Sequence, residues 1–345
     1  MNTKLLSKYR STIMGVAIFM VMMYHFCFNV DKAIFEPLNI FIPMSWPCVN
    51  LFIFVSGFGI YISLSKAGTT YGGFIGKRAI RLLPAYFPII IAYIVNSAVT
   101  EGVTVREVVG NLTLTAFFND YNHQFNWYTP TIFLFYIVSP LIYCVLNKNG
   151  KRLRNLIILI VAAIVINIGF YDEVLYTALS RLPLYMYGMY IGADYVENSS
   201  ENKQKKWAIY AAVSVIIMII GYIYAYICTY ELISEDFIYA TESYIGTITA
   251  PGLAVTIIGI CALVYKIPVL GKAIKWIVEK MGECSYEIYL IHLLILSIKP
   301  EWAYVYNVYR ILLIVGSVVA AVLYRYIIIK FVGAITRRDN VKAVS

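Results

Sequence analysis

Charged residues are scarce in this sequence. Of its 345 residues, 14% are charged and 61% are hydrophobic, whereas a soluble domain usually carries about 25% charged and about 45–50% apolar residues. One globule of this size could not hide such a surplus of apolar side chains, because its surface still has to be covered. The composition therefore excludes an ordinary soluble protein and predicts a protein that lies in a lipid bilayer.

Motifs that carry chemistry in many soluble enzymes are also missing. The six cysteines are scattered, without the spacing of a metal site or a disulfide framework. The sequence has only three histidines, far apart and without carboxylates at ligand spacing, so we expect no metal site. We find no phosphate-binding glycine loop, Gly-x-Ser-x-Gly turn or paired-cysteine motif. The usual sequence motifs of a P-loop nucleoside triphosphatase, a serine hydrolase or a thiol oxidoreductase are therefore absent.

Long apolar runs divide the chain. A membrane-spanning helix needs roughly 20 mostly apolar residues, and ten runs approach that length. They cover residues 12–30, 46–65, 82–99, 127–146, 153–170, 178–196, 207–228, 244–265, 283–299 and 308–330. The connections are mostly short and polar, and we see no internal repeat. We therefore predict an all-α integral membrane protein of about ten transmembrane helices, with residues 1–345 forming one membrane domain and no separate soluble domain.

The basic residues fix the predicted orientation. The net charge is +9, and lysine and arginine gather in alternate connections, as expected for loops on the cytoplasmic side. One side collects 22 basic residues, from Lys4 in the N-terminal segment to Lys342 near the C-terminus, and the other side has five, Lys32, Arg106, Arg181, Lys299 and Arg310. This bias predicts that both termini are cytoplasmic, and it explains the positive charge without a nucleic-acid partner.

Ionisable side chains inside the apolar runs are candidates for function. They are costly in hydrocarbon and tend to mark functional sites or buried pairs. His25, His292 and Arg325 stand out. His25 lies about 13 residues into its run, or about 20 Å along a helix, which predicts a position in the outer half of the membrane. A neutral imidazole there can serve as a general base, a proton relay or a metal ligand, and a packed histidine with one hydrogen bond is the alternative. His292 is more typical of a structural residue.

A second candidate is the basic cluster Lys77, Arg78 and Arg81. Arg78 and Arg81 are three residues apart, so they share one face if the segment is helical. Two guanidinium groups on one face suit the phosphates of a cytoplasmic ligand, because their planar donors match phosphate oxygens. The alternative is an ordinary basic cluster that contacts lipid headgroups.

Five stretches, in order along nearly the whole chain, carry a family resemblance. They are Met14–His25, Asn50–Phe58, Lys77–Pro84 with its Arg-x-x-Arg and following proline, Arg181–Gly188 with its Arg-x-Pro, and Gly282–His292. Together they resemble the acyltransferase 3 family of bacterial membrane proteins, which transfer acyl groups to surface sugars and related acceptors. The order of the stretches and their places on the predicted helices agree with that family.

The resemblance implies a membrane O-acyltransferase of the bacterial inner membrane. The donor would be a cytoplasmic acyl-coenzyme A, most often acetyl-coenzyme A, with its phosphates held by Arg78 and Arg81 beside Lys77. His25 would act as general base on an acceptor hydroxyl, or would accept the acyl group covalently before passing it on; the sequence leaves both open. Asn50 would orient His25.

Four further residues are candidates for substrate binding. Tyr24 could line the cavity of His25, and Arg181, at the outer start of a predicted helix, could bind the acceptor. His123 and Trp127 could touch the acceptor from the outer side, although an interfacial role suits them equally.

The chain departs from the family pattern in two places. The family often has arginine eleven residues before the first histidine, where this chain has Met14, and Arg10 lies one helical turn earlier. The family commonly has aspartate where Asn50 stands. An asparagine can orient an imidazole, but it cannot stabilise an imidazolium by charge.

Two other functions stay open at this point. A secondary transporter or flippase would also have about ten helices with buried polar residues, and a catalytically silent sensor on the same fold is compatible with Asn50. The expected partners are the bilayer and a carbohydrate acceptor, not a nucleic acid, and a homo-oligomer is compatible with the sequence. The sequence names neither the acceptor nor the acyl group.

Overall fold

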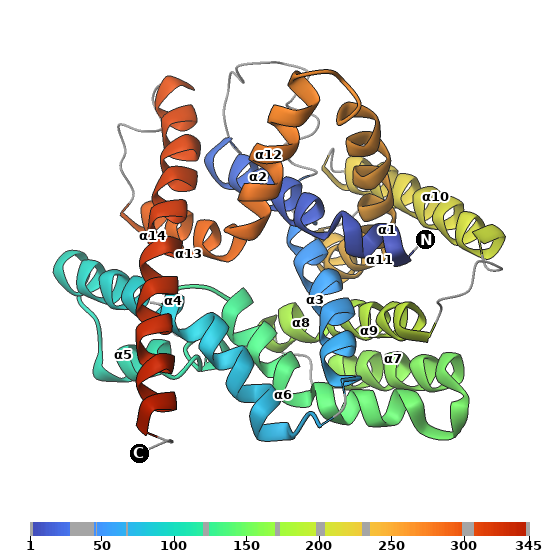
Figure 1. Ribbon diagram of the computed structural model, residues 1–345, viewed down its shortest axis with the longest axis horizontal. Helices are drawn as coiled ribbons and strands as arrows, with labels where there is room; N and C mark the ends of the chain where they lie inside the picture. Colours follow the sequence, from blue (N-terminus) through green and yellow to red (C-terminus); the bar gives the residue numbers. More distant parts are fainter. Residues whose placement is uncertain are drawn as a thin grey trace. The chain divides into compact units, whose positions relative to one another are not determined.

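All regular structure in the described part of the chain is helical. The computed structural model describes residues 3–27, 45, 47–66, 68–119, 124–169, 173–197, 204–229, 235–298 and 307–342. Over these ranges we find α-helices, short 3₁₀ helices and no strand (Figure 1). The prediction of an all-α protein is therefore confirmed for the described residues.

The chain divides into two compact units. Unit 1 combines Met1–Thr69 with Thr131–Glu283, and unit 2 combines Thr70–Pro130 with Cys284–Ser345. Each unit thus draws on two separate parts of the sequence, with one boundary inside a helix, after Pro130. The expected single membrane domain stays a prediction.

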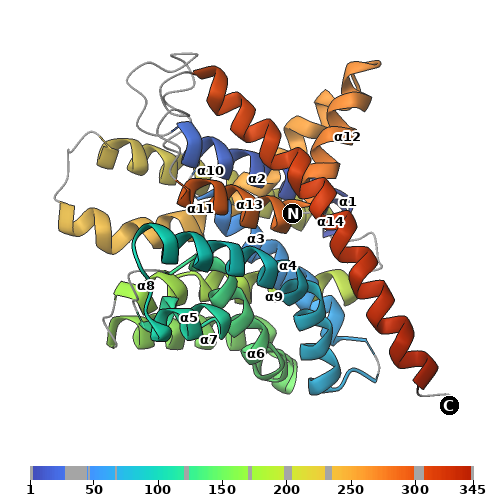
Figure 2. The same cartoon turned by 90° about the vertical axis from the view of Figure 1, so that its left-hand side faces the viewer.

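Unit 1 holds most of the helices. They are α1 (Thr3–Lys8), α2 (Arg10–Cys27), α3 (Cys48–Leu64), most of α6 (Tyr128–Asn147), η4 (Lys148–Gly150), α7 (Arg152–Gly169), α8 (Glu173–Leu179), α9 (Leu182–Glu197), α10 (Gln204–Thr229), α11 (Glu235–Val264) and α12 (Leu270–Glu283). Three pairs of these helices make its most extensive contacts: α3 with α9, α10 with α11, and α2 with α12 (Figures 1 and 2).

Glycine allows the α3–α9 pair to pack closely. A Cβ atom built on Gly57 of α3 would lie 2.1 Å from the carbonyl oxygen of Tyr185, and one on Gly188 of α9 would lie 2.3 Å from the carbonyl oxygen of Phe54. Small residues at helix contacts let backbones approach in this way inside membranes, where burial of apolar surface from water gives no driving force. This contact sets the relative positions of the first turn of α3 and the start of α9.

Unit 2 contains α4 (Tyr71–Thr100), α5 (Val105–Leu112), the 3₁₀ helix η3 (Phe117–Asn119), α13 (Ser285–Ser297), α14 (Asn307–Lys342) and the first residues of α6. Thr70 caps α4 by accepting a hydrogen bond from the Gly73 backbone N–H at 3.2 Å. The long helix α14, drawn in red, contacts α13 and α4 (Figure 2). One link is the Tyr324 hydroxyl, which donates to the Ala85 carbonyl oxygen at 2.7 Å.

Each of the ten predicted spans overlaps a helix, and length and composition place nine of these helices in two groups, with α9 in neither. Five helices are long and apolar enough to cross a membrane: Tyr71–Thr100, Tyr128–Gly150, Arg152–Gly169, Tyr244–Val264 and Tyr309–Ala334. Four further apolar helices are shorter within the described residues: Arg10–Phe26, Cys48–Leu64, Ala208–Tyr224 and Ser285–Ser297. Apolar helices on this scale indicate a membrane protein, while the count of ten spans and the cytoplasmic side of both termini stay predictions.

Candidate active site

The proposed base lies at the end of α2. The His25 side chain is exposed and its ring centroid lies 5.5 Å from that of Tyr24, with the two rings edge to face at 71°. Tyr24 is half-buried. The residues that follow, 28–44, lie outside the described part of the chain. An exposed imidazole at the end of an apolar helix is accessible to a substrate, which a general base requires.

Asn50 and Arg181 meet inside unit 1. Asn50 lies in the first turn of α3 and Arg181 immediately precedes α9; both are buried, with 0% and 7% of their surface exposed. The Nε of Arg181 donates a hydrogen bond to Oδ1 of Asn50 at 3.1 Å. Because guanidinium groups only donate hydrogen bonds, the Asn50 atom that faces Arg181 must be the oxygen. Two residues 131 positions apart in the sequence are thereby joined by the α3–α9 contact.

The other contacts of Arg181 come from the turn before α9. Its Nη1 donates to the Thr177 carbonyl oxygen, and it lies 3.4 Å from the Ser180 hydroxyl oxygen. The Ser180 carbonyl in turn accepts a hydrogen bond from the Thr247 hydroxyl at 3.2 Å, which links this turn to α11. These contacts hold the guanidinium group in one orientation.

Only one member of the Asn50–Arg181 pair, the arginine, is charged. The amide oxygen satisfies one donor of Arg181 but contributes no negative charge, whereas an aspartate at this position would form an ion pair. The Nδ2 of Asn50 is buried and finds no hydrogen-bond partner among the described residues. Asn50 therefore accepts a hydrogen bond from Arg181, and a role of Asn50 in orienting His25 stays a prediction.

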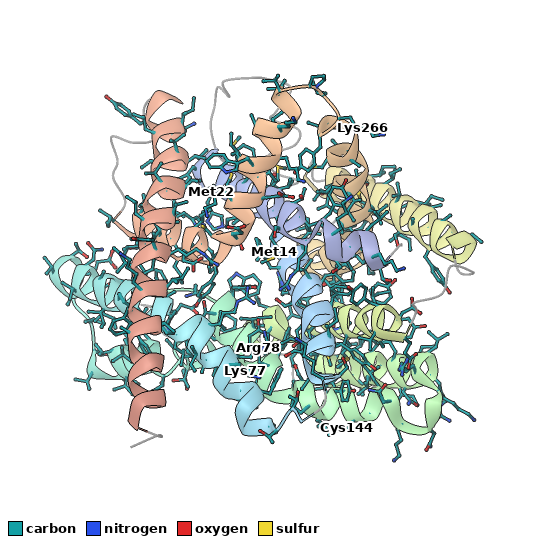
Figure 3. All side chains as sticks on the ribbon, viewed as in Figure 1. Met14, Met22, Lys77, Arg78, Cys144 and Lys266 are labelled. Atoms are coloured by element: carbon teal, nitrogen blue, oxygen red, sulfur yellow. The ribbon has the colours of Figure 1, made fainter. Side chains whose placement is uncertain are left out.

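The basic cluster lies on α4 in unit 2. The segment is helical, which is the condition under which Arg78 and Arg81 were expected to share one face. Lys77 and Arg78 project from this helix (Figure 3). Lys77 and Arg81 are exposed and Arg78 is half-buried. The guanidinium carbon of Arg78 lies 5.3 Å from the ring centroid of Phe74, one turn earlier. Such a cation–π contact fixes the plane of the guanidinium group. Arg81, three residues on, adds a second guanidinium group on the same side of the helix, so the pair could bind phosphate.

Trp127 belongs to an aromatic cluster of unit 2. It precedes α6, is half-buried, and its ring lies 6.0 Å from that of Tyr128. The Tyr128 ring lies 5.2 Å from Tyr289, which lies 5.5 Å from the ring of His292. These packing contacts are those of a structural aromatic residue, and a role of Trp127 in acceptor binding stays a prediction. His123 lies outside the described residues.

His292 is fully buried in α13. Its Nδ1 lies 3.0 Å from the carbonyl oxygen of Ile288, one turn earlier. Since a carbonyl oxygen only accepts, Nδ1 carries the proton. This arrangement agrees with the interpretation of His292 as a structural residue.

One intramembrane pair was not foreseen. Arg325 of α14 donates from Nη1 to both carboxylate oxygens of Glu287 of α13, at 3.1 and 3.3 Å. The sequence marked Arg325 as a charge within the last helix but did not assign it a partner. The available signal was Glu287, an acid within the neighbouring apolar run, because charges inside membranes tend to pair.

The structure thus groups the candidate residues by unit. Unit 1 holds Tyr24 beside His25 and joins Asn50 to Arg181, and unit 2 holds the basic cluster and Trp127. Sequence reasoning missed Thr177 and Ser180 as partners of Arg181, because backbone carbonyl and hydroxyl partners leave no motif. Among the described residues, no group of three His, Cys, Asp or Glu side chains could hold a metal ion, and a metal-free reaction stays a prediction.

Comparison with protein families gives one match. The family model of acyltransferase 3, described as an acyltransferase domain, matches residues 13–328. The matched range includes every candidate residue, from Tyr24 to Arg181. Comparisons with curated proteins and with solved structures give no match.

Proposed function

The chain belongs to the acyltransferase 3 family, and we propose that it moves an acyl group from a cytoplasmic acyl-coenzyme A to a hydroxyl of an extracytoplasmic carbohydrate or related surface acceptor. By resemblance the acyl group is most often acetyl. The observation that carries the proposal is the family match over residues 13–328 together with the apolar helices of a membrane protein. Its location would be the bacterial inner membrane, crossed several times.

His25 is the proposed general base. It takes the proton of the acceptor hydroxyl, and the oxygen then attacks the carbonyl carbon of the thioester. The carbon–sulfur bond breaks, coenzyme A leaves as the thiolate and takes up a proton, and an ester forms on the acceptor. A histidine suits this step because its ordinary pKa lies near working pH. The exposure of the His25 ring at the end of α2 supports the assignment, and covalent transfer through its imidazole is the other form of the same reaction.

Arg78 and Arg81 are the proposed donor-binding residues, with Lys77 beside them. Acyl-coenzyme A carries several phosphate groups, and paired guanidinium groups bind phosphate through parallel hydrogen bonds. The stacking of Arg78 on Phe74 supports this role, because it holds one guanidinium group in a fixed plane before the donor arrives. Arg181 is the proposed binding residue for the acceptor or for the charge that develops during transfer.

The test is acyl transfer by the purified chain in lipid, using radiolabelled acetyl-coenzyme A. Wild type is compared with His25→Ala and with Phe19→Ala, a change at an exposed apolar position of the same helix. General-base catalysis contributes about 10²–10⁴-fold, so His25→Ala should lose turnover by that factor while Phe19→Ala keeps it. Label retained on wild type but not on His25→Ala would indicate the covalent route.

Two results would contradict the proposal. If His25→Ala folds and keeps wild-type turnover, another residue is the base. If wild type neither binds nor consumes the donor, the enzyme assignment fails and transport of a polar or sugar-linked substrate becomes the function to test.

A further inference from the structure

Helix α12 is tied to the end of a helix that can cross the membrane. Residues 244–264 of α11 are long and apolar enough to span, and only five residues, 265–269, separate them from the start of α12 at Leu270. A stretch of five residues reaches at most about 17 Å when fully extended, and here it is folded into a turn, with the Gly271 backbone N–H bonded to the Ile267 carbonyl at 2.9 Å. The start of α12 therefore lies close to the plane where α11 leaves the bilayer.

A second attachment holds α12 against α2. Tyr265 donates from its hydroxyl to the Thr12 hydroxyl at 3.2 Å and stacks on Tyr9 with centroids 6.3 Å apart. A Cβ atom on Gly282 would lie 1.8 Å from the Ser11 carbonyl oxygen. The helix thus lies along the beginning of α2 (Figure 1).

The remaining surface of α12 has two different faces. At 100° per residue, the buried positions Gly271, Met281 and Gly282 form one side. Gly282 packs there against the start of α2, and Gly271 packs against the end of α11. A second side is mainly apolar and exposed: Leu270, Trp276 and Ile277 show 56%, 70% and 50% of their surface. The half-buried Lys280 lies between Trp276 and Ile277 on this side, with its Nζ 3.2 Å from the Glu283 carboxylate. A third side, next to the apolar one, carries the exposed Lys272 and Lys275 together with Glu279 and Glu283.

The charge of this segment is positive. Residues 266–283 contain four lysines and two glutamates. Lys266 stands exposed at the start of the connection (Figure 3). The Lys275–Glu279 pair spans 3.9 Å between exposed groups, and such surface pairs hold their partners weakly. The lysines remain available to another anion.

We propose that α12 lies in the plane of the membrane surface and binds anionic phospholipid headgroups. Leu270, Trp276 and Ile277 insert at the boundary between headgroups and acyl chains, and Lys272 and Lys275 contact the phosphates. A helix with lysines on its polar face and tryptophan on its apolar face behaves in this way, and tryptophan concentrates at this depth of a bilayer. Because the basic face adjoins the apolar face, the ligand must offer a negative charge next to hydrocarbon, which a phospholipid does.

Tryptophan fluorescence tests the proposal on the full chain in lipid nanodiscs. Brominated phosphatidylcholine or brominated phosphatidylglycerol serves as the quencher, and the difference between wild type and Trp276→Phe isolates the signal of Trp276. We expect that signal to be quenched by both lipids, and more strongly by the anionic one. A lysine near an anionic surface changes affinity by about fivefold, so Lys272→Gln and Lys275→Gln should each lower the preference for phosphatidylglycerol by up to that factor.

The matched control is Lys148→Gln with Lys151→Gln, two exposed lysines in the connection between α6 and α7. This variant should leave the lipid preference at Trp276 unchanged. Size-exclusion profiles in detergent establish that all variants fold.

Other results would overturn the proposal. Quenching of Trp276 by aqueous iodide but not by either bromolipid would show that the Trp276 side of α12 lies in water. Shielding from both kinds of quencher would indicate that protein, such as a second copy of the chain, covers it. Equal quenching by both lipids, with a raised KM for acyl-coenzyme A in the lysine variants, would assign the lysines to the donor. Because the lipid readout involves no acyl transfer, failure of the proposed reaction would leave it unaffected.

Discussion

At the scale of single residues, the most informative feature is the amide that faces Arg181. A guanidinium group in a protein interior usually has a carboxylate nearby, because burying an ion is costly unless it is hydrogen-bonded and paired. Here the Nε of Arg181 is bonded to Asn50, a neutral side chain. The pair fixes the geometry of the guanidinium group, and the Asn50 amide contributes no negative charge to it. Asn50 therefore acts as a positioning residue for Arg181.

A double-mutant cycle tests this coupling. Asn50→Leu keeps the side-chain volume but removes the acceptor, and Arg181→Met removes the donor. A hydrogen bond to a charged group contributes about 1.5–3 kcal/mol, so we expect a coupling of that size between the two substitutions. Thermal or denaturant unfolding of wild type, both single variants and the double variant in detergent gives the value. Additive effects of the two substitutions would show that the bond contributes nothing to stability.

The sequence supplied the candidate residues of the site, whose roles stay predictions, but it did not supply the contacts between them. His25, Asn50, Arg181 and the basic cluster were identified because their stretches resemble a family whose model does match the chain. The Asn50–Arg181 bond depends on how closely α3 and α9 approach, and that distance is set by glycines such as Gly57 and Gly188. A sequence read one helix at a time contains no information on which helices touch.

At the scale of helices, the contact between α2 and α12 depends on two glycines. A Cβ atom on Gly15 would lie 1.9 Å from the Val278 carbonyl oxygen, and one on Gly282 would lie 1.8 Å from the Ser11 carbonyl oxygen. Both would meet backbone atoms, which cannot rotate away as a side chain can. The two helices must separate to accept either side chain.

Gly282→Ala should therefore destabilise the chain. Overpacking of this kind costs about 1–3 kcal/mol, and the measurement is the midpoint of thermal unfolding in detergent. The matched control is Gly259→Ala in α11, where a Cβ atom would meet nothing within 4 Å. That change should be neutral or raise the midpoint, because alanine favours a helix over glycine by about 0.5–1 kcal/mol. Equal effects of both substitutions would contradict close packing of α2 on α12.

The sequence located helices well where they are continuously apolar and poorly where they are amphipathic. The predicted span 153–170 agrees closely with α7, Arg152–Gly169. By contrast, α12 and α5 both lie in stretches that were predicted to be connections between the apolar runs. A search for runs of about 20 apolar residues does not detect a helix such as α12, in which charged and apolar residues are interspersed along the sequence.

At the scale of the whole chain, the distribution of basic residues predicts the number of membrane crossings more directly than the lengths of the helices do. The bias of 22 basic residues against five depends on ten crossings, since one missing span would move every later loop to the other side. The helix that most needs a test is α9, whose 16 residues span about 24 Å at 1.5 Å per residue. A bilayer core is about 30 Å thick, which α9 matches only if the membrane thins locally or flanking residues reach the interface.

Single cysteines placed in a cysteine-free chain test the crossings directly. Glu101→Cys follows α4, Lys151→Cys precedes α7, and Lys266→Cys follows α11; all three positions are exposed. Four predicted spans, including α9, separate Lys151 from Lys266, so these two positions must share a side if all four cross. A membrane-impermeant maleimide should label Glu101→Cys in intact cells, and the other two only after the membrane is opened.

The pattern of labelling identifies which crossing fails. If Lys266→Cys reacts in intact cells together with Glu101→Cys, while Lys151→Cys does not, one of the four helices between Lys151 and Lys266 does not cross, and α9 is the shortest of them. In that case α12 would lie on the outer surface, away from the anionic cytoplasmic leaflet that favours its lysines. If all three positions react as expected, the basic loops lie together in the cytoplasm, where Lys77, Arg78 and Arg81 can meet an acyl donor that does not cross the membrane.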